Sequence, residues 1–258
     1  MGLSFTFLGS GTSYGVPMIG CRCLVCQSTD PRDRRLRASG VLRSGATTLL
    51  FDISPDLREQ ALRAKLDRLD AVFLTHTHAD HLHGIDDLRG FTRLSREMLP
   101  LYAQKDDVDF VLQHFNYIFE DNGFHLGWGI PRLDLRVVDR AAVQVGGLSV
   151  QPVPLRHGRG SAMGYRVGGL AYLTDCSEIP ETSYPLLQDL EVLIIDGLRW
   201  REHPTHFSFE QAFAEARKIG AAKTYLTHLA HDIAHAATEI LLPKHIYLAY
   251  DGLVVNCS

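Results

Sequence analysis

Four potential metal ligands crowd into six residues at the end of the stretch Leu74–His81: His76, His78, Asp80 and His81. The chain has 13 histidines among 258 residues, so chance alone does not explain this density. Neutral imidazoles and carboxylates bind divalent ions that activate water, provided that coordination positions stay open for water and substrate. The stretch therefore predicts a hydrolytic metal site.

The spacing of these ligands allows two neighbouring ions. His76 and His78 are two residues apart in an extended loop, so they can converge on one ion. Asp80 and His81 lie where the loop enters a helix, so they can face a neighbouring ion. Each ion then needs further ligands from elsewhere in the chain.

Three later residues are placed to supply those ligands, because His157, Asp175 and His228 each follow a predicted strand. Strand ends that gather at one edge of a sheet are where α/β folds assemble a shared site. A carboxylate such as Asp175 can bridge two ions about 3.5–4 Å apart and hold a shared hydroxide between them. From spacing alone, each of the three could equally be a polar residue of the core.

Short β-rich runs predict strands in both halves of the chain. The run Ala71–Leu74 delivers the metal motif, and a helical pattern follows from Gly84. Glycine-containing turns predict hairpins across residues 44–46 and 168–169, and a final hairpin over residues 251–252. Further strands are expected at residues 3–8, 148–155, 191–195 and 223–226.

Two helices have clear boundary signals. Ser54 and Pro55 predict the N-cap and first turn of a helix that runs to about residue 64. Ser208 and Gln211 form a capping box for a helix that ends at Gly220. We expect residues 83 to about 130 to be mainly helical, residues 30–37 to be a solvated charged connection, and residues 124–131 to be a packed loop.

Three of the five cysteines, Cys21, Cys23 and Cys26, lie close together. In an intracellular chain of this size, such clustering indicates metal binding before a disulfide. Buried free thiols are the alternative for this cluster. Cys176 and Cys257 are isolated, and we expect both to be packing residues.

The composition is that of an ordinary globular protein, with 45% hydrophobic and 22% charged residues. The net charge of −4 argues against nucleic-acid binding through a broad basic surface. No apolar run approaches the roughly 20 residues of a membrane-spanning helix, and the N-terminus lacks a secretory signal pattern. We expect a cytoplasmic protein without a membrane partner, made of a single domain over residues 1–258.

The motif Thr75–His81 resembles the signature of the metallo-β-lactamase superfamily, and the order of the three later candidates matches its downstream ligands. The resemblance covers essentially the whole chain. It implies an α/β fold, a four-layer αββα sandwich with a dinuclear site on its edge. It further implies two zinc or manganese ions, with His76, His78 and His157 on one, Asp80, His81 and His228 on the other, and Asp175 bridging them.

A narrower resemblance is to the phosphonate-pathway cyclic phosphodiesterases, the PhnP family. It rests on the three clustered cysteines together with the late run His228–His231. The resemblance implies a structural zinc held by Cys21, Cys23, Cys26 and His231, which is a closed tetrahedral ligand set. Such a site would tie the N-terminal loop to the loop that carries His228. A homodimer is a possible assembly.

By the same resemblance, His206 matches a histidine that contacts the phosphate or protonates a leaving alkoxide. His203 lies so close in sequence that it stays an alternative. Asp52 is expected to orient the metal motif through hydrogen bonds rather than to bind metal. We therefore expect the catalytic residues to be His206 and Asp80. The remaining histidines are expected to be surface or packing residues: His83, His114, His125, His235 and His245.

These inferences predict a dinuclear metal-dependent phosphodiesterase that acts on a small, cyclic phosphodiester such as phosphoribosyl 1,2-cyclic phosphate. One alternative is another hydrolase of the superfamily, either an RNA 3′-processing nuclease or a lactone or thioester hydrolase. The chain shows no glycine- and lysine-rich RNA-clamping arm, so nucleic acid is an unlikely partner. A second alternative is a non-catalytic protein that binds a metal or a ligand.

Overall fold

A computed structural model describes residues 2–95, 97–120 and 129–258. In these residues, two sheets of seven strands each form the centre of the fold. The first sheet has the order β14-β1-β2-β3-β4-β5-β6, and the second has the order β13-β12-β11-β10-β9-β8-β7. Strands of the first sheet are β1 Leu3–Gly9, β2 Ser39–Ser44, β3 Thr47–Phe51, β4 Ala71–Phe73, β5 Leu99–Ala103, β6 Leu133–Val137 and β14 Val254–Cys257. Strands of the second sheet are β7 Val143–Val145, β8 Leu148–His157, β9 Gly160–Val167, β10 Leu170–Leu173, β11 Val192–Asp196, β12 Lys223–Thr227 and β13 Ile246–Leu248.

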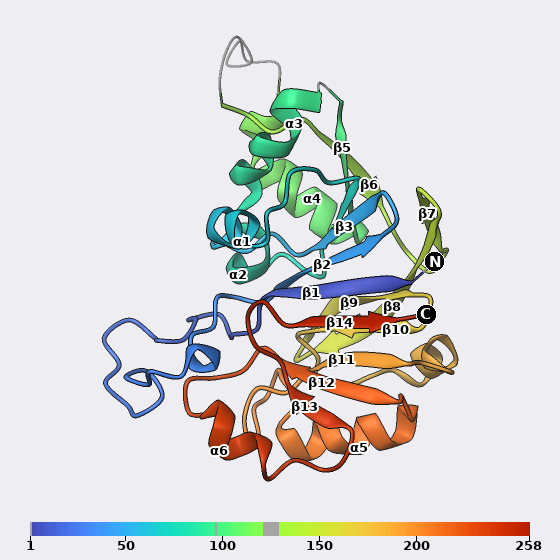
Figure 1. Ribbon diagram of the computed structural model, residues 1–258. Coiled ribbons are helices and arrows are strands. Elements are labelled where there is room, and N and C mark those ends of the chain that lie inside the picture. The colour runs from blue at the N-terminus through green and yellow to red at the C-terminus, as the bar shows by residue number, and fades with distance from the viewer. Residues whose placement is uncertain (1, 96, 121–128) are drawn as a thin grey trace.

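Helices cover the outer face of each sheet, and Figure 1 shows α1 to α4 on one side of the two sheets and α5 and α6 on the other. This arrangement confirms the predicted four-layer αββα sandwich. The α-helices are α1 Leu57–Arg63, α2 Ala79–Leu82, α3 Arg89–Ser95, α4 Lys105–His114, α5 Phe209–Ile219 and α6 His235–Glu239. Short 3-10 helices span Pro31–Asp33, Ile85–Leu88, Asn116–Ile118 and Glu181–Leu187.

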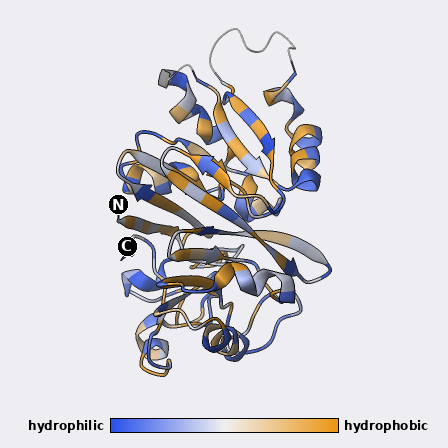
Figure 2. Cartoon of the chain, turned by 90° about the vertical axis from the view of Figure 1, so that its right-hand side faces the viewer, coloured by the Kyte–Doolittle hydropathy of each residue, from blue (hydrophilic) through white to orange (hydrophobic). Residues whose placement is uncertain are grey.

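Aromatic side chains fill the space between the two sheets, where alternate residues of every strand point inward. The Phe51 ring is central, and its centroid lies 5.6 Å from that of Tyr172 and 5.8 Å from that of Phe73. Phe5 and Tyr165 complete the contacts at 6.2 Å and 5.9 Å. Figure 2 shows the same concentration of hydrophobic residues along the central strands. This layer joins the sheets into one rigid support for their edges.

Parallel pairing brings several strand ends to one edge of the sandwich. β3 and β4 are parallel neighbours in the first sheet, and β10, β11 and β12 are parallel neighbours in the second. The residues that follow β3, β10 and β12 are Asp52, Asp175 and His228. Carboxyl ends of parallel strands therefore carry the candidate site, as in other open α/β sheets.

Most local signals correspond to the structure. The hairpin between β2 and β3 and the hairpin between β9 and β10 are confirmed by their antiparallel pairing. The capping box at Ser208 and Gln211 is present, and Gly220 ends α5 with a left-handed φ of 74°. Cys176 and Cys257 are buried as packing residues.

The expected final hairpin over residues 251–252 is wrong. β13 pairs with β12 in the second sheet, and β14 pairs with β1 in the first. Asp251, in the turn, accepts hydrogen bonds from the N–H groups of Ser10 and Leu36, so it anchors the chain where it crosses between the sheets. Turn chemistry is local, and it does not say which sheet receives the next strand.

The expectation for residues 83 to about 130 is wrong in part. Strand β5 lies inside that range, and it pairs with β4 and β6 because its apolar residues are buried within the first sheet. Residues 121–128, which include the aromatic residues Phe124 and Trp128 of the expected packed loop, lie outside the described residues. The preceding helix α1 starts at Leu57 rather than Pro55, with Asp56 at its N-cap position.

The charged segment 30–37 is not a solvated connection, because its central charges are buried. Asp33 and Arg35 are 4% and 1% exposed, respectively. A run of charged residues predicts solvent exposure only when no distant part of the chain offers hydrogen-bond partners. Here the partners of Arg35 and Asp33 are backbone groups about 200 positions later in the chain. In the described ranges, the helices include none that is both long and apolar enough to cross a membrane.

Truncation of Phe51 should strongly destabilise the fold. Phe51→Ala removes the ring that contacts four other aromatic side chains. We expect a loss of about 3–5 kcal/mol in the free energy of unfolding, measured by urea denaturation. Leu62→Ala is the matched control, because Leu62 is 64% exposed on α1 and should change the value by less than about 0.5 kcal/mol. Equal midpoints for the two variants would contradict this account of the core.

Candidate metal centre

The structure brings all seven predicted active-site ligands to one edge of the sandwich, in adjoining clusters of potential metal ligands. Within each cluster, the potential ligand atoms lie within 4.8 Å of one another. The first cluster contains His76, His78, His157 and Asp175, and the second contains Asp80, His81 and His228. Six of the seven residues are buried, and His78 is exposed. The site is therefore buried on most sides and exposed to solvent at His78.

Asp175 lies between the two clusters and directs one carboxylate oxygen toward each. Its Oδ1 is 3.8 Å from the Nε2 atoms of both His76 and His157. Its Oδ2 is 3.0 Å from His81 Nε2 and 3.4 Å from His228 Nε2. A carboxylate in this position can bind two ions at once, one through each oxygen.

Three residues of the site hold a backbone conformation that non-glycine residues rarely adopt. The φ angles of Asp52, Asp175 and His228 are 62°, 53° and 63°. Asp52 and His228 directly follow a core strand, and Asp175 follows one after Thr174, so the chain turns sharply where it presents each side chain. Such strain costs of order 1–3 kcal/mol per residue and persists where the surrounding structure enforces it.

A second set of polar groups fixes the orientation of the candidate ligands. Asp52 Oδ2 lies 2.8 Å from His81 Nδ1, and Asp52 Oδ1 accepts a hydrogen bond from the Thr75 N–H. The Thr75 hydroxyl donates to Asp52 and lies 3.0 Å from His76 Nδ1. These contacts confirm that Asp52 orients the motif loop. They leave the Nε2 atoms of both histidines directed at the cluster.

The histidine from β8 is held from a different direction. His157 Nδ1 donates to the carbonyl of Thr205 at 2.7 Å, so its Nε2 faces the site. Thr205 also packs against Gly158, where an added Cβ would meet the threonine side chain at 2.6 Å. No local pattern indicates this contact, because residues 157 and 205 are distant in the chain and Thr205 lies in an irregular loop.

The protonation preferences of the histidines fit a divalent cation. Burial lowers the pKa of His76 and of His157, which keeps both imidazoles neutral and able to bind metal. Burial also opposes the charged form of His81, but Asp175, Asp52 and Asp80 raise the pKa of His81 well above its usual range. The centre therefore favours positive charge at this position, which a divalent ion supplies.

An unpartnered buried nitrogen points to the same ligand. Among the described residues, the Nε2 atom of His76 is buried and has no hydrogen-bond partner, and Asp175 Oδ1 is 3.8 Å away from it. A buried polar atom without a partner costs about 1–3 kcal/mol unless a metal or another group satisfies it. The donor set of imidazoles and carboxylates suits zinc and manganese.

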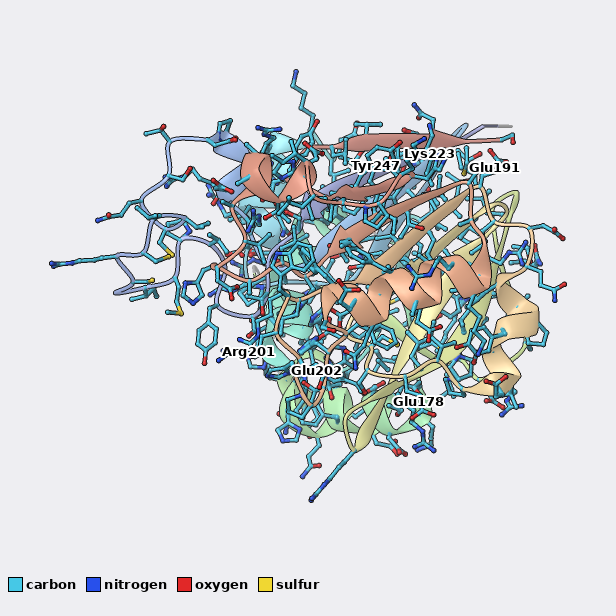
Figure 3. All side chains as sticks on the ribbon, turned by 90° about the horizontal axis from the view of Figure 1, so that it is seen from below. Glu178, Glu191, Arg201, Glu202, Lys223 and Tyr247 are labelled. Carbon is cyan, nitrogen blue, oxygen red and sulfur yellow. The ribbon has the colours of Figure 1, made fainter. Side chains whose placement is uncertain are left out.

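A separate cluster joins the N-terminal loop to the loop after β12. The Sγ atoms of Cys21 and Cys23 lie 3.4 Å and 3.5 Å from His231 Nδ1, and Cys26 completes the group. The backbone N–H of Cys26 and the His231 ring lower the pKa of Cys23 to about 6, whereas burial raises the pKa of Cys26 to about 11. Figure 3 shows the sulfur-bearing side chains on this projecting loop. Three thiols and one imidazole suit a tetrahedral zinc ion.

His206, rather than His203, faces the centre. Its ring stacks on that of His228 with centroids 4.7 Å apart, and its Nδ1 lies 2.7 Å from Asp196 Oδ2. Burial lowers the pKa of His206, but the Asp196 carboxylate outweighs burial and raises it to about 9. His203 contacts Thr205 instead, and burial lowers its pKa.

The role of Asp196 was missed by the sequence analysis, although it ends a buried strand in the same way as the candidate ligands. Asp196 also accepts a hydrogen bond from the Cys176 N–H, which fixes its carboxylate beside His206. The histidines expected to be surface or packing residues lie outside these clusters in the described part of the chain, and His125 is outside the described residues.

Comparisons with known proteins agree with this fold and site. A model of the "Beta-lactamase superfamily domain" matches residues 47–229. The solved structure of a diphosphatase from the PhnP family has a TM-score of 0.93 and 42% identity, and the match covers 100% of this chain and 98% of that one. Zinc-bound PqqB from Methylobacterium extorquens shares the fold, with a TM-score of 0.79, 18% identity and coverage of 98% and 99%.

A curated relative of similar identity is longer than this chain. An octanoyltransferase of Porphyromonas gingivalis (strain ATCC BAA-308 / W83) is 42% identical over 250 residues, which are 95% of this chain and 50% of that protein. The chain therefore spans about half the length of this relative.

The family match and the full-length superposition show that this chain belongs to the metallo-β-lactamase superfamily. Its resemblance to the PhnP family is confirmed by the 42% identity and full-length superposition with the PhnP-family diphosphatase.

Removal of the Asp52 charge should weaken metal binding without removing a ligand. Asp52→Asn deprives His81 Nδ1 of its carboxylate partner. Partners of this kind typically contribute 10- to 100-fold to metal affinity, and we expect a loss in that range by titration against a competing chelator. Asp70→Asn is the control, because Asp70 is a surface carboxylate that accepts from Thr48 N–H. Unchanged affinity in Asp52→Asn would show that Asp52 does not orient the ligands.

Proposed function

We propose that this chain is a metal-dependent hydrolase that cleaves a P–O bond in a small phosphodiester or diphosphate with the help of two divalent ions. The observation that carries the proposal is the position of Asp175, with one oxygen toward each ligand cluster and His206 on the adjoining rim. The PhnP-family diphosphatase supports the phosphoryl class. A cyclic phosphodiester such as phosphoribosyl 1,2-cyclic phosphate is our first candidate within that class.

In this proposal, each ion has three ligands of its own and shares a seventh. His76, His78 and His157 would hold the first ion, Asp80, His81 and His228 would hold the second, and Asp175 would be shared between them. Zinc and manganese both accept such mixed sets. When bound, the two ions would activate a water and offset the negative charge that develops on the phosphoryl oxygens.

The residues around the ions prepare the site for that chemistry. Asp175 would hold an ion with each of its oxygens, and Asp80, whose Oδ2 is 3.3 Å from His228 Nε2, is the second carboxylate of the centre. Burial of these groups excludes bulk water, so their charges act in a medium where electrostatic interactions are strong. The exposed His78 marks the side from which substrate enters.

His206 supplies the proton for the leaving oxygen. Its Nδ1–H donates to Asp196, which leaves the Nε2–H free to donate to the departing alkoxide or phosphate. The Asp196 carboxylate stabilises the imidazolium before transfer and holds the ring in place. Asp196 is thus a positioning residue for His206.

The cysteine cluster has a structural role in this proposal. Cys21, Cys23, Cys26 and His231 would hold one zinc ion as a closed tetrahedral set. These residues would thereby fix the projecting loop of residues 18–26 to the loop after β12.

A second candidate is hydrolysis of an acyl thioester or lactone. One observation favours it, because the P. gingivalis relative is named an octanoyltransferase. The matched region is only half of that protein, so the acyl chemistry can belong to its other half. An octanoyl thioester therefore belongs in the assay panel.

The metal-loaded protein should hydrolyse members of a panel containing a five-membered cyclic phosphodiester, a dinucleoside diphosphate and bis(p-nitrophenyl) phosphate. We expect His76→Ala and Asp80→Ala to lower kcat/KM by more than about 100-fold, because each variant removes a ligand. His114→Ala, on an exposed helix face, should leave the rate unchanged. Unchanged turnover in both ligand variants would overturn the proposal, and cleavage of the octanoyl thioester alone would favour the acyl alternative.

The role of His206 predicts a dependence on the leaving group. His206→Asn should lower kcat by about 10²–10⁴-fold for substrates with an alkoxide leaving group, because an alkoxide requires a proton. The loss should be much smaller for a p-nitrophenolate leaving group, which departs without one. An equal loss for both substrates would show that His206 binds the phosphoryl group rather than acting as an acid.

A further inference from the structure

A fully buried arginine contacts the loop after β12, which carries one residue of each metal cluster. The side chain of Arg35 has no exposed surface, and its guanidinium is directed at the segment after β12. Nη1 donates to the carbonyl of Ala230 at 3.1 Å, and Nη2 donates to the carbonyl of Ile233 at 2.7 Å. The guanidinium therefore holds the carbonyls on both sides of one turn of the loop.

Asp33 extends the same set of contacts. Its Oδ1 accepts a hydrogen bond from Arg35 Nη2 at 3.1 Å and another from the His235 N–H at 2.7 Å. Arg35 Nε donates to the carbonyl of Arg32 at 3.2 Å, which holds the arginine in its own turn. The buried pair thus contacts the later loop at three successive points.

The backbone around Arg35 is also tied to the edge of the sandwich. Arg35 and Val16 exchange two backbone hydrogen bonds, of 2.7 Å and 2.8 Å. Gly11 lies so close that an added Cβ would meet the Arg35 Cβ at 2.8 Å, so this position requires glycine. Leu229 donates its N–H to the carbonyl of Ser10 and accepts from the Thr12 N–H. None of these contacts involves a cysteine.

The contacted loop links the two metal clusters in sequence. His228 belongs to the dinuclear centre and His231 to the cysteine cluster, and Ala230 lies between them. Figure 1 shows the N-terminal loop that carries Arg35 beside the chain that leads into α6. Two supports therefore act on His228: the Arg35–Asp33 pair and, three residues away, the cysteine cluster.

We propose that Arg35, held by Asp33, is the positioning residue that sets His228 for metal binding, and that it does so without the zinc of the cysteine cluster. The cysteine cluster then shapes the projecting loop of residues 18–26. This inference rests on the metal ligands assigned in the proposed function. The positioning of His228 and the shaping of the loop of residues 18–26 are then two separate roles, of which only the second belongs to the cysteine cluster.

The chemistry of the contact requires arginine. A guanidinium presents several N–H groups in a rigid plane and can bind two carbonyls and a carboxylate together. A lysine at the same position carries the charge on one flexible amine, so it can satisfy only part of this set. The carbonyls left without a donor would be buried, and the loop would shift to find water.

Cobalt titration can test the proposal, because a thiolate-rich tetrahedral site and a histidine–carboxylate site give distinct absorption bands. In Arg35→Lys we expect one cobalt ion of the dinuclear centre to bind about tenfold more weakly, while the thiolate band titrates as in the wild type. In Cys23→Ser we expect the thiolate band to be lost, while the dinuclear centre keeps its affinity within about twofold.

Two further variants serve as controls. Arg32→Lys changes a neighbouring, partly exposed arginine that pairs with Asp30, and it should alter neither site. Asp33→Asn keeps an oxygen for the His235 N–H but removes the charge beside Arg35, so we expect a smaller, selective weakening of the dinuclear centre. This variant carries the test if Arg35→Lys does not fold.

Two results would overturn the inference. One is wild-type cobalt affinity at the dinuclear centre in the folded Arg35→Lys variant or, if that variant does not fold, in Asp33→Asn. The other is a loss in Cys23→Ser as large as the loss in the Arg35 variant. Because the probe is cobalt alone, the outcome does not depend on the substrate. Failure of the wild-type protein to cleave any phosphodiester or diphosphate would count against the proposed function only.

Discussion

The carboxylate of Asp175 is the interaction on which the site depends. Burial opposes its charge, but His228 and His81 lower the pKa of Asp175 well below the usual range, so it stays ionised between two groups of imidazoles. A buried charge of this kind is stable only when its partners are held in place. The strained turns at Asp52, Asp175 and His228 show that the fold accepts local cost to hold them. The remaining architecture can be understood as the means of enforcing that geometry.

The two sheets hold the groups around Asp175 in position. The aromatic layer around Phe51 locks the sheets face to face, so strand ends from both sheets meet at one edge with little freedom. A loop alone would not hold imidazole nitrogens from three strand ends close enough together to bind two ions. The polar groups behind the ligands, Asp52 and the Thr205 carbonyl, then select which nitrogen of each ring faces inward. The contact between His206 and Asp196 at the rim follows the same principle.

The loop after β12 receives its own support, since it carries a ligand but no regular structure until α6. Arg35 and Asp33 reach it from a segment whose charges look solvent-exposed in the sequence. Burying that pair is unfavourable unless every donor and acceptor is satisfied, and the carbonyls of Ala230 and Ile233 satisfy it. The N-terminal loop is therefore packed against the segment that carries His228 and His231.

The sequence by itself determined which donor groups form the candidate site, because His76 to His81 crowd together. It also determined the capping box, the tight hairpins and the strand periodicity, because these are local patterns. Those patterns also placed His157, Asp175 and His228 at strand ends. Only the tertiary structure decided which groups act behind them. It paired Asp196 with His206, buried Arg35 and sent β13 and β14 to different sheets. These outcomes depend on contacts between residues that are distant in the chain. Their energies come from burial and mutual satisfaction of polar groups, which no local pattern encodes.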